Sequence, residues 1–483
     1  MLLAFVIVYL LGTIAIGLWA AKRVKTAADF AIAGRHLPLY MIVTTTFATW
    51  FGSETVLGIP AKFVEGGLRS VVEDPFGSSM CLVLVGFFFA AKLYRMTLLT
   101  ISDYYRERFG RVVEVACALV IIASYIGWVA AQVTALGLVF NVLSGGAIGI
   151  ATGMVIGTIS ILAYTLFGGM WSVAVTDFIQ MIVLVVGLAI IAVFAADMAG
   201  GAHRVISFAA SREMFRFFPE PSARDIVFFI GSAVTIMLGS IPQQDVFQRV
   251  MSAKTEYAAT RGPVIGGLCY LAFAFVPMFL VASALLIMPG EAQTLLKEDP
   301  QKVLPSLVLD RMPFVLQVAF FGALLSALKS VASATLLAPS VTFVESIWRP
   351  LRPKMSDREE LLAMRITVLV FAAMVCGYAI ASQGEPIYDL VSGSYALPLV
   401  AAFVPLVCGL YWKRATTQGA MFSIVLGFAA YLLFLATPAG KAFPATLAGL
   451  LASGAGMVIG SVGRQALSDR RGAHYALRAR ANS

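Results

Sequence analysis

Residues 44–58 read TTTFATWFGSETVLG and lie inside an apolar segment, 38–62, that is long enough to cross a bilayer. The stretch places hydroxyl side chains, two glycines and the carboxylate of Glu54 at membrane depth. Polar sequence with glycine inside a span is typical of a discontinuous helix, whose exposed carbonyls and helix ends bind ions and substrates in transporters. We therefore predict a broken membrane helix here, with a binding site at the break.

A second irregular stretch, residues 239–248, reads GSIPQQDVFQ and ends another apolar segment, 225–248. The two irregular segments begin five segments apart. This spacing suits two inverted repeats of five helices, in which the first helix of each repeat is broken.

The composition agrees with a protein that lies largely within a membrane. Of the 483 residues, 60% are hydrophobic and 13% charged, whereas ordinary soluble domains carry about 25% charged residues. We therefore predict an all-α polytopic membrane protein with about thirteen spans. The expected spans are 2–21, 38–62, 74–95, 112–142, 147–167, 172–196, 225–248, 262–288, 313–345, 363–383, 387–411, 417–437 and 443–463.

Basic residues cluster in alternate loops, for example in residues 22–35, 92–111 and 349–358. Basic loops face the cytoplasm, so we expect the N-terminus outside and the C-terminus inside. The net charge of +9 therefore reflects the basic loops on the cytoplasmic side rather than a surface that binds nucleic acid. We expect membrane lipid but no nucleic acid as a partner. The expected location is the plasma membrane, taken to be a bacterial inner membrane.

Five motifs occur in order along the chain. They are FAIAGR at 30–35, ISDYYRERFG at 101–110, YTLFGGMWSVAVTDFIQ at 164–180, QDVFQRVMSAK at 244–254 and WKRATTQGA at 412–420. Together they resemble the sodium:solute symporter family, which includes proline, pantothenate, sialic acid and sugar symporters. The resemblance implies a leucine-transporter-like fold with an extra helix and loop (1–35), an inverted-repeat core (36–411), and two C-terminal helices with a basic tail (412–483).

The resemblance also implies a sodium site between the broken helix and the segment 313–345. Its ligands would be the carbonyl oxygens of Ala48, Phe51 and Ala323 and the hydroxyl of Ser326. Oxygen ligands suit a hard cation. Ala327 departs from the family pattern, because a methyl group stands where a second hydroxyl ligand is expected.

Some members of the family have a second cation site, and its matching residues here are Asp177, Lys329 and Ser330. Lys329 is an ionisable residue deep in an apolar span, where such residues are rare and usually paired. One hypothesis is that the Lys329 ammonium fills this site and bridges to Asp177. Transport would then be independent of sodium or coupled to a proton. The alternative is a static salt bridge beside a working sodium site. Sodium or a proton is thus the expected coupling ion, with no other cofactor.

Six residues are candidates for contact with the solute. Glu54 lies just past the break and suits a substrate with an amine or could carry a proton; alternatively it lines a vestibule or pairs with Lys62. For the glutamines, helix–helix hydrogen bonding is the alternative role, and for the tryptophan it is ordinary packing. The candidates are Trp50, Ser53, Glu54, Glu73, Gln132 and Gln244.

The predicted function is secondary active symport, by alternating access, of a small organic solute such as an amino acid. A solute sensor that keeps the transporter fold and an uncoupled facilitator are the alternatives, and flux measurements in liposomes separate them. We expect no enzyme, because the sequence carries no nucleophile–base constellation, nucleotide loop or metal cluster. The sequence leaves the solute and the oligomeric state open.

Overall fold

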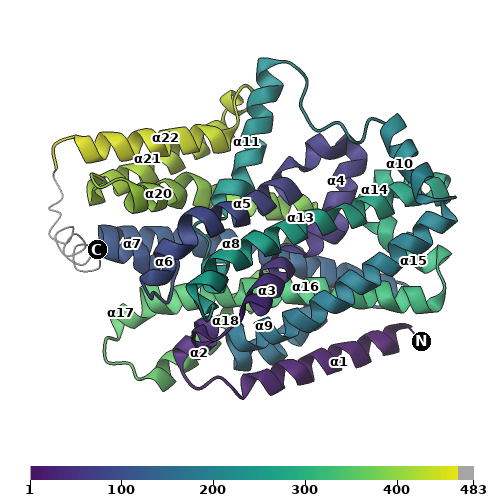
Figure 1. Ribbon diagram of the computed structural model, residues 1–483, viewed down its shortest axis with the longest axis horizontal. Helices are drawn as coiled ribbons and strands as arrows, with labels where there is room; N and C mark the ends of the chain where they lie inside the picture. The colour runs from purple at the N-terminus through teal and green to yellow at the C-terminus, as the bar shows by residue number, and fades with distance from the viewer. Residues whose placement is uncertain (1, 466–483) are drawn as a thin grey trace.

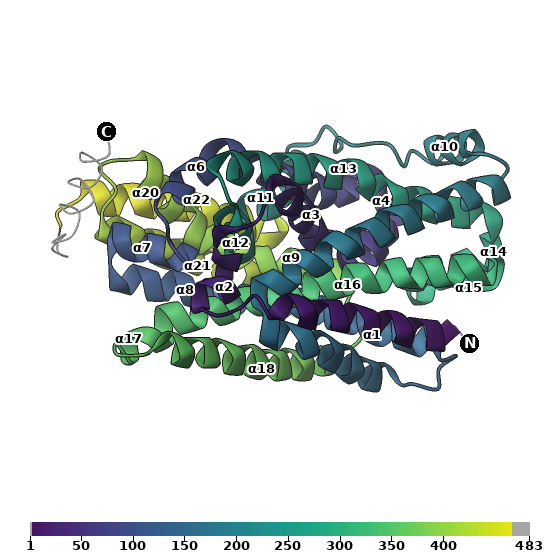
Figure 2. The ribbon, with the colours of Figure 1, turned by 60° about the horizontal axis from the view of Figure 1, so that its bottom comes forward.

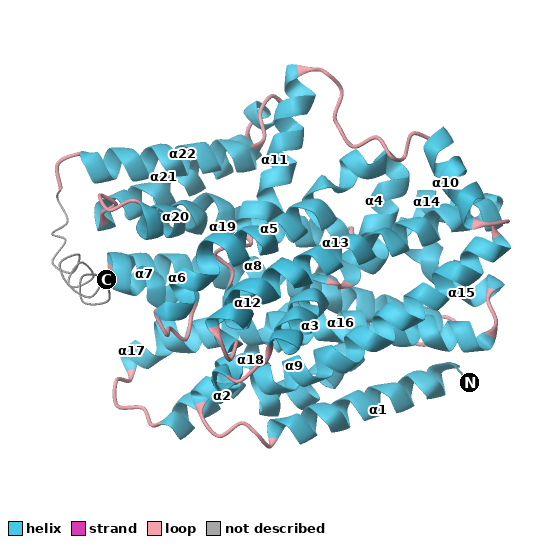
Figure 3. Cartoon of the chain, viewed as in Figure 1, coloured by secondary structure: helices cyan, strands magenta, loops and turns pink. Residues whose placement is uncertain are grey.

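The computed structural model describes residues 2–465, and residues 466–483 of the expected basic tail lie outside this range. Within it the chain folds into helices and contains no strand (Figure 3). One isolated bridge pairs Leu37 with Ala253. The all-α class expected from the composition is confirmed.

The helices fall into long and short ones. The long helices are α1 (Leu2–Ala21), α8 (Arg111–Leu143), α9 (Ile150–Met198), α11 (Ala223–Gly239), α13 (Glu256–Ile287), α16 (Phe314–Phe343), α18 (Asp357–Ala381), α21 (Thr417–Ala436) and α22 (Ala445–Val462). The shorter ones are α2 (Ala27–Ile32), α3 (Leu39–Trp50), α4 (Ile59–Gly66), α5 (Ser78–Leu84), α6 (Ala90–Arg95), α7 (Ile101–Phe109), α10 (Ala202–Ser211), α12 (Gln244–Ser252), α14 (Pro289–Glu298), α15 (Val303–Arg311), α17 (Arg349–Leu351), α19 (Ile387–Pro398) and α20 (Val404–Tyr411). Between them lie short 3-10 or π turns: η1 (Ala33–Arg35), η2 (Glu54–Gly58), η3 (Gly67–Val71), η4 (Val72–Gly77), η5 (Val85–Phe89), η6 (Pro300–Lys302), η7 (Val344–Trp348), η8 (Leu399–Phe403) and η9 (Pro438–Lys441).

Local sequence explains where several helices begin. Thr100 caps α7 and Ser356 caps α18, and in each case the acid three residues later, Asp103 or Glu359, accepts a hydrogen bond from the backbone N–H of the capping residue. This reciprocal arrangement satisfies backbone donors that the first turn of a helix leaves free. The capping boxes thus fix the points at which these basic loops become helices.

Both expected helix breaks are present. α3 ends at Trp50, the backbone of Phe51 is non-helical (φ −93°, ψ 73°), and the chain continues through η2 into α4. Gly52 is needed at this bend, since a Cβ there would lie 2.8 Å from Glu54 Oε2 and 2.9 Å from Gln132 Oε1. The second break separates α11 from α12, which meet at an angle of 45°.

The number of expected membrane crossings differs from the number of continuous helices. α9 covers two expected spans, 147–167 and 172–196, and changes direction at Gly169, where φ is +46°. The second half of the expected span 38–62 also runs on into the span 74–95, because helical turns follow one another from Glu54 to Arg95, with non-helical backbone at Gly67 and Asp74. Ten helices in the described range are long and apolar enough to span a membrane, or eleven with the bent pair counted. Thirteen crossings, the orientation and the division at 35 and 411 stay predictions.

The helices pack in two groups, and the first break lies where these groups meet. α3, α5, α11 and α13 lie together, and α8, α9, α16 and α18 form the second group. α1 runs along α9, and α21 packs on α22 at the opposite side of the molecule (Figure 1 and Figure 2). The break in α3 therefore faces α8, α9 and α16, which supply the side chains described next.

Candidate functional site

Glu54 is anchored at the first break by contacts with α8. Its Oε2 atom accepts a hydrogen bond from Gln132 Nε2 at 2.8 Å and one from the Ser53 hydroxyl at 3.3 Å. The backbone N–H of Ser53 donates to Gln132 Oε1 at 2.9 Å. Gln132 therefore holds both the carboxylate and the backbone of the bend, and three of the predicted solute contacts lie together. All three are buried, and Glu54 does not pair with Lys62.

Three aromatic rings meet beside this carboxylate. Trp50 stacks on Tyr395 with ring centroids 5.7 Å apart, and Trp128 is tilted against both rings at 5.7 Å and 5.3 Å. They come from α3, α8 and α19, and each is at most 3% exposed. The Tyr395 hydroxyl has no hydrogen-bond partner among the described residues. We call Trp50, Trp128 and Tyr395 the aromatic cluster.

Two further acids lie on the α4 side of the break. Asp74 is buried and accepts hydrogen bonds from Ser78 at 2.6 Å and Tyr270 at 2.5 Å. The Tyr270 hydroxyl also contacts the Thr55 hydroxyl at 3.0 Å. Glu73, a predicted solute contact, instead accepts a hydrogen bond from Ser392 of α19. Glu73 and Glu54 thus have separate sets of partners.

A second cluster, rich in oxygen atoms, joins α3, α9 and α16. Asp177 accepts hydrogen bonds from Thr45 Oγ1 and Ser330 Oγ, both at 2.5 Å. The Ser330 hydroxyl also lies 3.2 Å from the backbone carbonyl oxygen of Ala48. A carboxylate, two hydroxyls and a carbonyl are the ligand types that a hard cation such as sodium prefers. We call Thr45, Ala48, Asp177 and Ser330 the oxygen cluster.

The expected sodium ligands on α16 are arranged differently. The hydroxyl of Ser326 donates to the carbonyl of Gly322 in its own helix and contacts the Tyr9 hydroxyl of α1. Ala323 and Ala327 are buried, and Ala323 lies where a Cβ on Gly187 of α9 would meet it. The hydroxyl that reaches the break is therefore that of Ser330, one helical turn beyond Ser326.

Lys329 does not bridge to Asp177, so that part of the sequence hypothesis is wrong. Its ammonium group donates to Thr13 Oγ1 of α1 at 2.6 Å and lies 5.2 Å from the centre of the Tyr164 ring. Consecutive residues of a helix point about 100° apart, so Lys329 faces α1 while Ser330 faces Asp177. Within residues 2–465, no carboxylate forms an ion pair with Lys329.

Gln244 also lies apart from the aromatic cluster. Its Oε1 atom accepts a hydrogen bond at 2.8 Å from the backbone N–H of Ile101, at the first turn of α7. The neighbouring Gln243 turns to α8 instead and donates to Ser124 at 2.9 Å. This placement makes Gln244 a contact between helices, the alternative role considered for it.

Several residues of the site were missed by the sequence analysis. Trp128 lies four residues before Gln132, on the same face of α8, and this spacing was the available signal. Tyr395, Thr45, Thr13 and Tyr9 offered none, because their relation to the break depends on how distant helices pack.

A cavity of about 590 Å³ lies alongside α4. Lys62, which lines it, pairs with Asp389 at 3.3 Å and Glu65 at 3.8 Å. The ionisable side chains of the lining are Lys62, Glu65, Glu298, Asp299, Lys302, Glu385 and Tyr388. Carboxylates outnumber lysines there, so the cavity attracts cations.

Residues 30–427 match the sodium:solute symporter family. The chain is 29% identical to the high affinity choline transporter 1 of Homo sapiens, over 92% of this chain and 77% of the relative. Its structure is similar to a Na+-coupled sialic acid symporter, with a TM-score of 0.83 and 19% identity over 97% of this chain and 99% of the symporter. It is also similar to MhsT in complex with L-phenylalanine, with a TM-score of 0.56 and 15% identity over 87% of this chain and 97% of MhsT. These likenesses confirm the expected leucine-transporter-like fold class.

Proposed function

Because the chain belongs to the sodium:solute symporter family, we propose that it imports a small organic cation by alternating access, with sodium as the coupling ion. Family membership makes it a multi-pass transporter of the plasma membrane rather than an enzyme. The observation that carries the proposed solute is the aromatic cluster beside Glu54 at the helix break.

The chemistry of this site favours an alkylated ammonium group. Such a group carries positive charge but few or no hydrogen-bond donors, and aromatic faces stabilise it through cation–π attraction worth about 2 kcal/mol or more when desolvated. Glu54 supplies the opposite charge, and no described lysine or arginine pairs with it. The similarity to choline transporters supports this class of solute over the amino acid favoured by the sequence.

The charge of the cavity beside α4 suits the same solute. This 590 Å³ cavity is lined by more carboxylates than lysines. A negative lining raises the local concentration of cations and slows anions. An organic cation would therefore be concentrated in this cavity.

We assign sodium to the oxygen cluster. A sodium ion at Asp177 would draw Ser330 of α16, Thr45 and the Ala48 carbonyl of α3 towards one centre, and thereby join the two groups of helices. A ligand shifts a conformational equilibrium by its difference in affinity for the two states. Membrane potential supplies about 2.3 kcal/mol per charge at 100 mV, and a tenfold gradient adds about 1.4 kcal/mol.

Lys329 has a separate part in this proposal. It acts as a fixed group between α1, α9 and α16, and sodium binds without displacing it. Proton coupling through Lys329 is the second candidate, because this buried amine has no described carboxylate partner. Dependence of uptake on a pH gradient without sodium would favour the second candidate.

The proposal is tested by uptake of radiolabelled choline into proteoliposomes that contain the full chain. We expect accumulation above the external concentration with an inward sodium gradient, and none when potassium replaces sodium. Tetramethylammonium should compete, whereas glucose should not. Choline flux without accumulation would identify a facilitator, and binding without flux a sensor; either result contradicts symport.

A further inference from the structure

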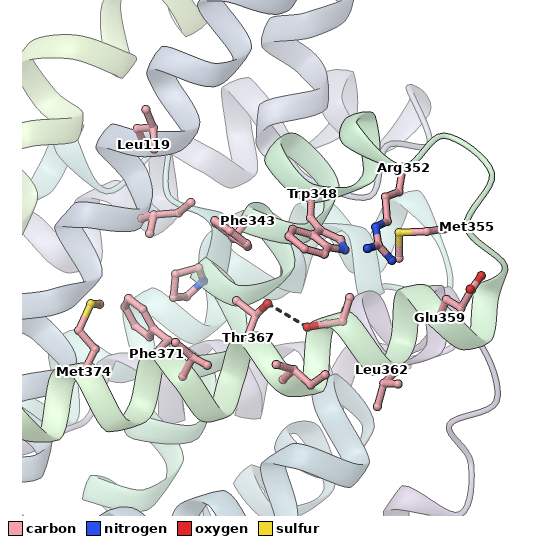
Figure 4. Close-up of a pocket in the computed structure, with 15 residues that line it drawn as sticks. Leu119, Phe343, Trp348, Arg352, Met355, Glu359, Leu362, Thr367, Phe371 and Met374 are labelled. Atoms are coloured by element: carbon pink, nitrogen blue, oxygen red, sulfur yellow. Dashed lines mark hydrogen bonds between the residues drawn. The ribbon is translucent and has the colours of Figure 1, made fainter.

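An apolar groove of about 680 Å³ runs along the outside of the second helix group (Figure 4), and its lining includes no residue of the aromatic or oxygen cluster. Leu119 of α8, Phe343 of α16 and Phe371 of α18 form its walls. Its rim consists of large apolar side chains that are about half exposed, namely Leu119, Leu362, Ile366 and Met374. On a membrane protein such an exposed apolar surface contacts lipid chains.

One end of the groove is cationic. There Arg352 lies over the Trp348 ring, 5.4 Å from its centre, and Figure 4 shows both beside Met355 and Glu359. The neighbouring Arg349 is occupied by Glu345, at 2.9 Å. No described carboxylate lies within ion-pair distance of Arg352, and its one acidic neighbour in the groove is Glu359, which attracts it from farther away.

A second hollow, of about 410 Å³, continues from this end of the groove. It is lined by Arg352, Pro353, Lys354, Met355 and Glu359, three of which also line the groove. Glu359 belongs to the capping box of α18, and its Oε2 atom accepts hydrogen bonds from the Ser356 N–H and hydroxyl, both at 2.8 Å. The hollow is lined by two basic residues, Arg352 and Lys354, and by one acidic residue, Glu359, so its net charge is positive.

We propose that the groove and the hollow together bind one anionic phospholipid. An acyl chain lies along α18, and the phosphate lies in the hollow between Arg352 and Lys354. Each buried methylene of the chain adds to the affinity, and basic pockets beside membrane helices select anionic headgroups. On the predicted orientation this end faces the cytoplasm, the leaflet in which anionic lipids are enriched. A zwitterionic lipid such as phosphatidylcholine would bring its own cation into the hollow beside these two basic residues, so a phospholipid with net negative charge binds more tightly.

Trp348 provides a reporter for the test. The full chain is placed in phosphatidylcholine nanodiscs and titrated with phosphatidylglycerol that carries brominated chains, which quench nearby tryptophan. Subtracting the signal of Trp348→Phe isolates quenching at the groove. We expect saturation at a lower mole fraction with phosphatidylglycerol than with phosphatidylcholine that carries the same chains.

Two variants decide whether charge is responsible. Arg352→Gln should raise the half-saturating fraction of phosphatidylglycerol about five-fold, since one basic residue near the surface is worth about that factor. Lys413→Gln, in the loop between α20 and α21 and outside both hollows, should leave it unchanged. Equal quenching by both lipids, or no effect of Arg352→Gln, overturns the proposal. Absence of quenching by either lipid also overturns it, because another occupant such as a second copy then covers the groove.

Discussion

The Ser330 hydroxyl donates a hydrogen bond to Asp177 Oδ1 at 2.5 Å and so joins α16 to α9 beside the helix break. The same hydroxyl reaches the Ala48 carbonyl oxygen of α3. One side chain thus contacts both groups of helices at the point where the broken helix meets them. A cation bound there would respond to any movement of α3 against α9 and α16.

Loss of this hydroxyl should abolish stabilisation by sodium. In Ser330→Ala the oxygen cluster loses one ligand, so the thermal midpoint should no longer rise when sodium chloride replaces potassium chloride at equal ionic strength. In the wild type, sodium at ten times its dissociation constant stabilises by about 1.4 kcal/mol. Ser340→Ala is the control, because Ser340 is buried in the same helix and bonds only to Leu336. An unchanged sodium response in Ser330→Ala would place the ion elsewhere.

Removal of the Lys329 charge should leave the protein stable. Breaking a buried ion pair costs about 3–5 kcal/mol, but replacement of a buried charge by an apolar side chain is often neutral or stabilising. Because Lys329 pairs with the Thr13 hydroxyl rather than an acid, we expect Lys329→Met to unfold at the same temperature as the wild type or higher. Sodium-driven uptake should persist. A large drop in the midpoint would point to a hidden acidic partner, and loss of uptake to proton coupling.

Neutralisation of Glu54 should weaken binding of an organic cation. Glu54→Gln keeps the shape of the side chain but removes the charge beside the aromatic cluster, so choline affinity should fall about ten-fold or more. Equilibrium binding of radiolabelled choline to the purified chain measures this. Glu256→Gln is the control, since Glu256 pairs with Arg95 at the surface and is not a candidate for solute contact. Equal effects of the two variants would mean that Glu54 has no special role.

The aromatic ring of Trp128 should contribute through its face. Trp128→Leu removes the cation–π contact, worth about 1–2 kcal/mol, and should lower choline affinity about five- to thirty-fold. Trp128→Phe should lose less, because a ring remains. Trp19→Leu, on the exposed surface of α1, serves as the control. If Trp128→Leu and Trp128→Phe bind choline as well as the wild type, the aromatic cluster is only packing.

A side chain at Gly52 should disrupt the bend and the site together. The Cβ of Gly52→Ala would lie 2.8 Å from both Glu54 Oε2 and Val331 Cγ2, which forces the carboxylate away from Gln132. We expect a loss of choline binding in a chain that still folds and reaches the membrane. Gly12→Ala meets nothing within 4 Å and is the control. Normal binding by Gly52→Ala would show that the bend can adjust.

The sequence predicted features that depend on composition and local pattern. The hydroxyls and glycines of residues 44–58 marked the first break. Ser53, Glu54 and Gln132 lie together there, and their contact with a solute stays a prediction. The predicted pairing of Lys329 with Asp177 was wrong because Lys329 points from α16 towards α1 and not towards Asp177. A position in a span gives the depth of a side chain, whereas its partner depends on which neighbour faces that side of the helix.

The aromatic cluster could not be assembled from the sequence. Trp50, Trp128 and Tyr395 come from three helices that are far apart in the chain, and only packing brings their rings within 6 Å. Ser330 differs from Ser326 by one turn, so the choice between them depends on the axial position of α16 relative to α3. Such shifts of a few ångströms leave no pattern in a single sequence.

The most direct test of the account is the effect of sodium on choline binding by the purified full chain and by Asp177→Asn. Linked sites must raise each other's affinity by the same factor. We predict that sodium chloride raises the affinity for radiolabelled choline over potassium chloride in the wild type, and that Asp177→Asn binds choline equally weakly in both salts. Equal choline binding by the wild type in the two salts would contradict sodium coupling through the oxygen cluster.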